Sequence, residues 1–151
     1  MIINTIGELI PVLQTAIGPV ILISGIGLLL LTMTNRLGRT IDRARELLDE
    51  YEELSEAARS KIDREIVVLW RRAHYARNAI LLASLTCLGA ATLIILLFMT
   101  SLLHVDLPLL IESIFIISML CLIAALVFFL LDVNLTLSAL RIELEGHRKK
   151  S

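Results

Sequence analysis

Lysine and arginine are absent from two long segments of this chain, residues 1–35 and 78–140, and all fourteen of them lie in residues 36–77 and 141–150. Aromatic residues are also scarce at 5% of the chain, whereas hydrophobic residues reach 57%, above the ~45–50% typical of soluble domains. Long apolar segments without cations, each followed by a basic block, indicate a membrane protein.

The sequence also lacks the residue groupings that catalysis and cofactor binding need. It contains no Ser/His/Asp, Cys/His, metal-ligand or phosphate-loop pattern. Its two cysteines, Cys87 and Cys121, lie in apolar segments without ligand-like spacing, so we interpret them as packing residues rather than a disulfide or metal pair. We therefore expect no enzymatic activity, no cofactor and no metal. Acidic residues interleaved with the basic ones argue against nucleic-acid binding.

Three apolar stretches are longer than the ~20 residues that a helix needs to cross a bilayer. They are Leu9–Thr34, Asn78–Leu103 and Leu107–Leu131. Short cytoplasmic loops retain Lys and Arg, whereas translocated segments lack them. We therefore expect the N-terminus outside and the C-terminus in the cytoplasm.

The charged segment between the first two spans predicts a cytoplasmic antiparallel helical hairpin. Each of its two arms carries apolar residues at alternating intervals of four and three, which form one helical face. No proline separates the first span from the first arm, which predicts one continuous helix, and Ser60 with Asp63 has capping-box spacing for the start of the second arm. The two faces consist of Leu37, Ile41, Ala44, Leu48 and Tyr51, and of Ile62, Ile66, Leu69, Ala73 and Ala76.

The predicted fold is all-α, with three transmembrane helices, a cytoplasmic hairpin that extends the first two, and assembly as a homo-oligomer. The expected segments are an outer tail with the first transmembrane helix (1–34), the charged hairpin (35–77), the second transmembrane helix (78–103), a short outer loop (104–106), the third transmembrane helix (107–134) and a cytoplasmic helix with a basic tail (135–151).

A polar stripe runs along the first span and its cytoplasmic continuation. At 100° per residue its members lie within roughly 40° of one line, and the neighbouring faces are bulky and apolar. Repeated around a symmetry axis, the polar stripe would line a pore, with apolar narrowings and arginines at the inner mouth. Alternatively, its glycines serve only close helix packing. The polar stripe consists of Gln14, Gly18, Ile21, Gly25, Leu28, Thr32, Arg36, Arg39 and Arg43.

Acidic residues near the ends of the third span are candidates for an ion pair or an ion site. Asp132 lies at the depth of Arg36, Arg39 and Arg77, where pairing lowers the cost of a carboxylate near hydrocarbon. A structural pair and a proton or ion site both remain open for it. At the outer end, Asp106 and Glu112 form either a weak cation site with His104 or a solvated cluster.

The segment Thr34–Arg45, with its Thr-Asn-Arg-Leu-Gly-Arg-Thr-Ile-Asp-Arg run, resembles the bacterial family called domain of unknown function 2721. The run from Leu13 to Gly27 and the Leu69-Trp-Arg-Arg-Ala segment share this resemblance. The family name implies three membrane spans and no established activity. It also implies a bacterial source and hence the inner membrane.

Two functions fit these residues. The first is a homo-oligomeric ion channel whose pore is lined by the first span, because three spans in one protomer cannot enclose a pore. The second is a membrane scaffold or regulator that does not conduct, in which the hairpin binds a cytoplasmic protein partner. The lipid bilayer is a partner in both cases.

Overall fold

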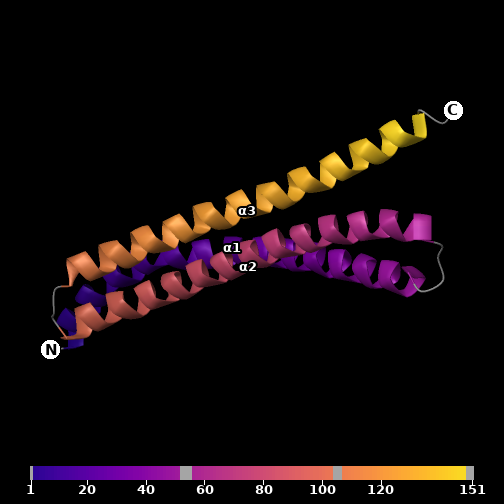
Figure 1. The fold of residues 1–151 in the computed structure, drawn as a ribbon. Coiled ribbons are helices and arrows are strands. Elements are labelled where there is room, and N and C mark those ends of the chain that lie inside the picture. Colours follow the sequence, from indigo (N-terminus) through magenta and orange to yellow (C-terminus); the bar gives the residue numbers. More distant parts are fainter. Residues whose placement is uncertain (1, 52–55, 104–106, 149–151) are drawn as a thin grey trace. The chain divides into compact units, whose positions relative to one another are not determined.

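Three long helices make up the protein. The computed structural model describes residues 2–51, 56–103 and 107–148, and every one of these except Leu107 is helical. In chain order the helices are α1 (Ile2–Tyr51), α2 (Glu56–Leu103) and α3 (Pro108–Arg148), as Figure 1 shows. The predicted all-α fold class is therefore confirmed.

Each helix is long and apolar enough to cross a membrane. The candidate spans lie within Leu13–Asp49, Ile62–Leu103 and Pro108–Thr136, and their most apolar windows have mean hydropathies of 2.3, 2.5 and 3.2. Only 17%, 22% and 11% of these windows are buried within the protein. Apolar surface of this extent is rare on soluble monomers, so the chain is a membrane protein whose helices require a lipid environment.

The helix ends differ in part from the sequence prediction. α1 runs from the apolar segment into the charged segment as one helix, as the absence of proline there predicts. α2 begins at Glu56, so the prediction that Ser60 starts this helix is wrong. The residues before Ser60 include Glu56 and two alanines, which are strong helix formers and extend the helix toward its N-terminus. His104 and Asp106 of the expected outer loop lie outside the described residues.

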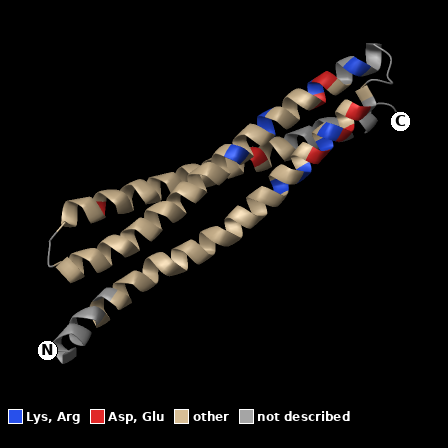
Figure 2. Ribbon diagram, turned by 90° about the horizontal axis from the view of Figure 1, so that it is seen from below, with Lys and Arg blue, Asp and Glu red and all other residues tan. Residues whose placement is uncertain are grey.

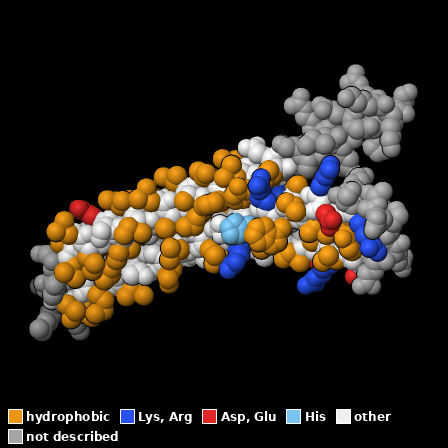
Figure 3. All heavy atoms as spheres, viewed as in Figure 1, with side chains coloured by type: hydrophobic (Ala, Val, Ile, Leu, Met, Phe, Trp, Pro, Cys, Tyr) orange, Lys and Arg blue, Asp and Glu red, His pale blue; other side chains and the backbone are white. Residues whose placement is uncertain are grey.

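The chain divides into two compact units, and each helix contributes to both. Unit 1 comprises Met1–Leu31 and Leu81–Ala124, and unit 2 comprises Thr32–Ile80 and Ala125–Ser151. Among the side chains of unit 1 that the structure describes, Glu112 is the only charged one, whereas unit 2 carries many arginines and carboxylates (Figure 2). Hydrophobic side chains cover the visible face of unit 1 (Figure 3).

In unit 1, small and hydroxylated side chains lie where α2 meets α3. Ala83, Thr86 and Ala90 of α2 are buried. The Thr86 hydroxyl lies 3.0 Å from the Leu82 carbonyl of its own helix and 3.3 Å from the Ser118 carbonyl of α3, and it donates to both. A Cβ on Gly89 would overlap the Ser118 hydroxyl. Small residues thus let α2 and α3 approach closely, as in many membrane helix pairs.

Unit 2 contains a leucine-centred core between α1 and α2. Leu47 of α1 packs against Ile62 and Leu69 of α2. Because Leu47 is late in its helix and Ile62 is early in the next, the two helices are antiparallel here. The remaining apolar contacts of this core are made by Ala44, Tyr51 and Ile66.

The predicted apolar face of the second arm matches the structure, and Ala44 and Tyr51 of the first arm pack against the core as predicted, but two other members of the first arm do not. Ile41 and Leu48 are 40% and 54% exposed, whereas Thr40 and Leu47 are buried. Thr40 can take an inward position because its hydroxyl donates to the Arg36 carbonyl oxygen at 3.0 Å. A polar side chain whose hydrogen bond is made by its own helix is less costly to bury.

Candidate functional site

The carboxylate of Asp132 organises the polar centre of unit 2. Asp132 is 2% exposed on α3. Its Oδ2 atom accepts from Nε of Arg36 at 3.0 Å and lies 2.9 Å from Nη2 of the same guanidinium. Arg36 Nη2 also donates to the hydroxyl of Thr136 at 3.3 Å. One arginine of α1 therefore contacts two residues of α3 that are one helical turn apart.

A second arginine, Arg72 of α2, lies near the other oxygen of the same carboxylate. Arg72 Nε lies 3.5 Å from Asp132 Oδ1, which is too long for a good hydrogen bond. Both of these buried atoms have no hydrogen-bond partner among the described residues. The Arg36 and Arg72 side chains are only 23% and 19% exposed. A single negative charge is thus shared by two partly buried positive charges.

One aromatic ring of α3 contacts this cluster. The Arg36 guanidinium lies over the ring of Phe129, with 5.6 Å between Cζ and the ring centroid. The ring of Phe128 faces Tyr75 of α2 at a centroid distance of 6.1 Å. A cation over a ring face gains from the negative potential of that face, which helps to hold Arg36 in its position.

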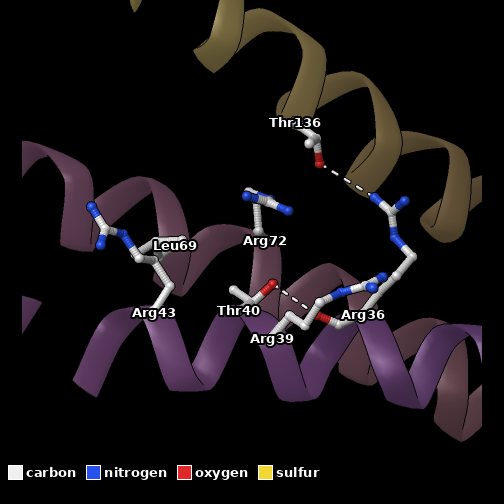
Figure 4. Close-up of a pocket in the computed structure, with 7 residues that line it drawn as sticks. All are labelled: Arg36, Arg39, Thr40, Arg43, Leu69, Arg72 and Thr136. Atoms are coloured by element: carbon white, nitrogen blue, oxygen red, sulfur yellow. Dashed lines mark hydrogen bonds between the residues drawn. The ribbon is translucent and has the colours of Figure 1, made fainter. Parts of the chain in front are cut away.

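Next to the cluster is a cavity of about 270 Å³, which we call the arginine pocket. Figure 4 shows its residues: three arginines and a threonine from α1, Leu69 and Arg72 from α2, and Thr136 from α3. The guanidinium of Arg36 reaches across to Thr136 in this view. The arginine pocket is lined by Arg36, Arg39, Thr40, Arg43, Leu69, Arg72 and Thr136.

Regular helical spacing brings these side chains to one place. Arg36, Thr40 and Arg43 follow each other at intervals of four and three on α1, which keeps them on one side of the helix. Arg72 is three residues after the buried Leu69. It therefore lies on the face of α2 that is directed inward.

Comparison with protein families matches this chain over residues 16–142 to the family described as "Protein of unknown function (DUF2721)". The chain belongs to this family. The DUF2721 match covers Arg36, Arg72 and Asp132, and thus the whole cluster. The comparisons with curated proteins and with solved structures gave no match.

In this DUF2721 chain, the members of the polar stripe that belong to unit 1 are all exposed. Ile21 and Leu28 have exposed fractions of 66% and 70%. A Cβ built on Gly18 or Gly25 would meet no atom within 4 Å. The fifth member of this part, Gln14, is exposed as well. Gly18 lines an apolar pocket together with Ala90 of α2 and Met119 of α3, so this part of the polar stripe borders the other helices of unit 1 while its own residues stay largely exposed.

The members of the polar stripe in unit 2 lie in two different surroundings. Thr32, Arg39 and Arg43 are exposed, whereas Arg36 is partly buried against Asp132. Arg43 forms ion pairs with Glu46 at 3.2 Å and with Glu65 at 3.4 Å. Pore lining by these residues stays a prediction.

The three acidic candidates also differ. Asp132 lies in the arginine cluster described above, and Glu112 is exposed on α3 in unit 1. Asp106 lies outside the described residues. Among the side chains that the structure describes, no group of three His, Cys, Asp or Glu residues could hold a metal ion.

Sequence reasoning placed Arg36 beside Asp132 by depth but missed Arg72 and Thr136. Arg77, which it had placed at the same depth, is exposed. The signal for Arg72 is its spacing from the buried residues of α2, three after Leu69 and four before Ala76. Alternation of three and four residues marks the inward face of a helix. An arginine at such a position requires an acidic partner.

Proposed function

We propose that this protein is a homo-oligomeric ion channel whose pore is lined by α1. The observation that supports the proposal is the exposure of the polar stripe in unit 1, from Gln14 to Leu28. Polar side chains in a membrane interior usually face other protein or a water-filled path. Several copies around an axis would cover the polar stripe, which one protomer leaves uncovered.

Apolar narrowings would control the passage of ions. Ile21 and Leu28 are separated by two helical turns, and both side chains extend away from their own protomer. Rings of such residues exclude water when they are narrow and thereby block ions. Gln14 and Thr32 on either side would present polar groups to the permeating ion. The proposed mechanism therefore uses hydration of the narrowings and no chemical step, and we propose that the protein is not an enzyme.

The proposed location is the bacterial inner membrane, with the N-terminus outside and the C-terminus in the cytoplasm. The concentration of arginine in unit 2 supports this orientation, because cytoplasmic segments retain Lys and Arg. The α1 and α2 parts of unit 2 would then form the cytoplasmic hairpin.

Conductance of reconstituted protein tests the channel. Purified full-length protein in planar bilayers with a salt gradient is compared with the Leu28→Ser variant, which should raise the resting conductance because it hydrates a narrowing. Leu31→Ser is the matched control, since Leu31 is 60% exposed on the same helix but lies about 100° from the line of the polar stripe. Equal conductance of the two variants, or silence of all three proteins, would refute the proposal.

The second candidate is a scaffold that does not conduct. It is favoured by Trp70 of α2, which is 72% exposed and stacks on the ring of His74 with 5.8 Å between ring centroids. Val67, three residues earlier, is 63% exposed. Exposed tryptophan beside an apolar residue is common where a protein partner binds. This candidate would be supported if the wild-type protein conducts no current in planar bilayers and if the Trp70→Ala variant binds less of a cytoplasmic protein partner than the wild type does.

A further inference from the structure

The arginine pocket carries more positive than negative charge. Four arginines line it, and their carboxylate partners among the described residues are Asp132, Glu46 and Glu65. Asp132 is shared by two of the arginines. Among the side chains that the structure describes, none forms an ion pair with Arg39. The pocket therefore has capacity for an added anion.

The donors in the pocket are suited to a phosphate group. A guanidinium presents several N–H donors in a planar fork that matches phosphate oxygens, and such bonds are stronger than neutral ones. In Figure 4 the side chains of Arg36 and Arg39 extend in the same direction from α1, and the Arg72 side chain extends from α2 into the space between α1 and α3. The volume of about 270 Å³ is below the ~300–1,000 Å³ of pockets for drug-sized ligands. It fits a head group rather than a larger molecule.

The position of the pocket along each helix also indicates phosphate. Arg36 is the first cation after the apolar segment of α1, and Asp132 is the first charged residue after Glu112 on α3. Arg72 precedes Asn78, where the apolar segment of α2 begins, by somewhat less than two turns. Lipid phosphates are found at the level where apolar segments end, and basic pockets between transmembrane helices bind anionic head groups.

We propose that the arginine pocket binds a phosphate group with net negative charge, held by Arg39, Arg36 and Arg72. The phosphate belongs either to an anionic phospholipid or to free inorganic phosphate. This inference goes beyond the proposed channel and does not depend on it, because the pocket lies within one protomer and requires no conduction.

Binding to the purified full-length protein in detergent separates the two sources. Native mass spectrometry measures the affinity for phosphatidylglycerol and for phosphatidylcholine, and thermal unfolding is followed as inorganic phosphate is added. Preference for phosphatidylglycerol without stabilisation by inorganic phosphate assigns a lipid head group. Stabilisation by inorganic phosphate assigns a soluble ligand. Absence of both effects would overturn the proposal.

Arg39→Gln locates the binding, with Arg71→Gln as its matched control. Both arginines are exposed and belong to unit 2, but Arg71 does not line the pocket. Arg39→Gln should weaken phosphate or phosphatidylglycerol binding about fivefold, the effect of one cation near a membrane surface. Arg71→Gln should leave it unchanged. Arg39→Lys should give an intermediate loss, because it keeps the charge and loses the planar fork.

The outcome that would contradict this placement is an equal loss for Arg39→Gln and Arg71→Gln, which would mean that the anion responds only to total surface charge. Helix content measured by circular dichroism checks that the variants remain folded. Neither substitution removes a partner of the buried Asp132, so we expect the helix content to be unchanged.

Discussion

The two units differ in the polar side chains that they bury between their helices. Both units bury alanines and larger apolar residues, but unit 1 adds the hydroxyl groups of Thr86 and Ser118, whereas unit 2 adds the Asp132 carboxylate, which is paired with arginines. Between helices in lipid there is no hydrophobic driving force, so close approach and interhelical hydrogen bonds decide stability. Among the described residues, the hydroxyl contact between helices belongs to unit 1 and the ion pairs belong to unit 2.

The inward face of α1 nevertheless continues through both units. Ile26, Met33, Thr40 and Leu47 are buried at intervals of seven residues. This is the spacing of a coiled-coil seam, in which helices cross at a small angle. Three of these four residues, Met33, Thr40 and Leu47, belong to unit 2, where the seam faces the arginine cluster and the leucine core.

The largest effect that we expect is that of Asp132→Asn in unit 2. It removes the one negative charge shared by two partly buried arginines, and loss of one partner from a buried ion pair costs about 3–5 kcal/mol. The unfolding temperature in detergent should fall accordingly. Glu112→Gln is the control, because it makes the same chemical change at an exposed position of unit 1. Equal unfolding temperatures for the two variants would show that the arginine cluster does not stabilise unit 2.

The next effect tests the leucine core of unit 2. Leu47→Ala should lower the free energy of unfolding by about 3 kcal/mol, because Leu47 is 2% exposed and its truncation leaves a cavity. The neighbouring Leu48→Ala should change it little, since Leu48 is 54% exposed. Chemical unfolding in detergent measures both. Similar losses for the two leucines would mean that unit 2 has no leucine-centred core and would break the comparison.

In unit 1, Gly89→Ala should cost about 1–3 kcal/mol through overpacking, because the new methyl group would overlap the Ser118 hydroxyl. Gly27→Ala is the matched control, since a Cβ there would meet nothing within 4 Å. Adding Ser118→Ala to Gly89→Ala should restore most of the lost stability. If Gly89→Ala and Gly27→Ala change the free energy of unfolding equally, the close approach of α2 and α3 does not stabilise unit 1.

The smallest effect concerns the hydrogen bond between α2 and α3 in unit 1. Thr86→Val should lower stability by about 0.6 kcal/mol, the average for interhelical hydrogen bonds in membranes. The Thr92 hydroxyl donates to the Leu88 carbonyl of its own helix at 2.8 Å, so Thr92→Val tests loss of a hydroxyl without loss of an interhelical bond. Unfolding curves measured in the same detergent compare the two. A larger loss for Thr92→Val would contradict the role of Thr86.

The fold class followed from the sequence because hydropathy and the distribution of Lys and Arg are properties of long segments. The sequence predictions were wrong where the burial of a side chain depends on one or two residues. Intervals of four and three fit two neighbouring faces of a helix almost equally well, so Ile41 and Leu48 were predicted inside in place of Thr40 and Leu47. The hydrogen bond that allows Thr40 to be buried becomes visible only in the folded helix.

The arginine cluster could be predicted only in part, for a related reason. Depth along a helix placed Arg36 near Asp132, but depth does not distinguish Arg72 from Arg77. Their directions around α2 differ, and the buried neighbours of Arg72 reveal its direction. The pocket itself depends on three helices meeting, which a pattern on a single helix does not contain.

Trp70 has a spectroscopic consequence. It is the single tryptophan of the chain and lies in unit 2, so emission excited at wavelengths that spare tyrosine reports on that unit alone, while far-ultraviolet circular dichroism reports on all three helices. Coincidence of the two signals during unfolding is a test of two-state behaviour. The wild-type protein, without any attached label, thus allows the unfolding of unit 2 to be compared with that of the whole molecule.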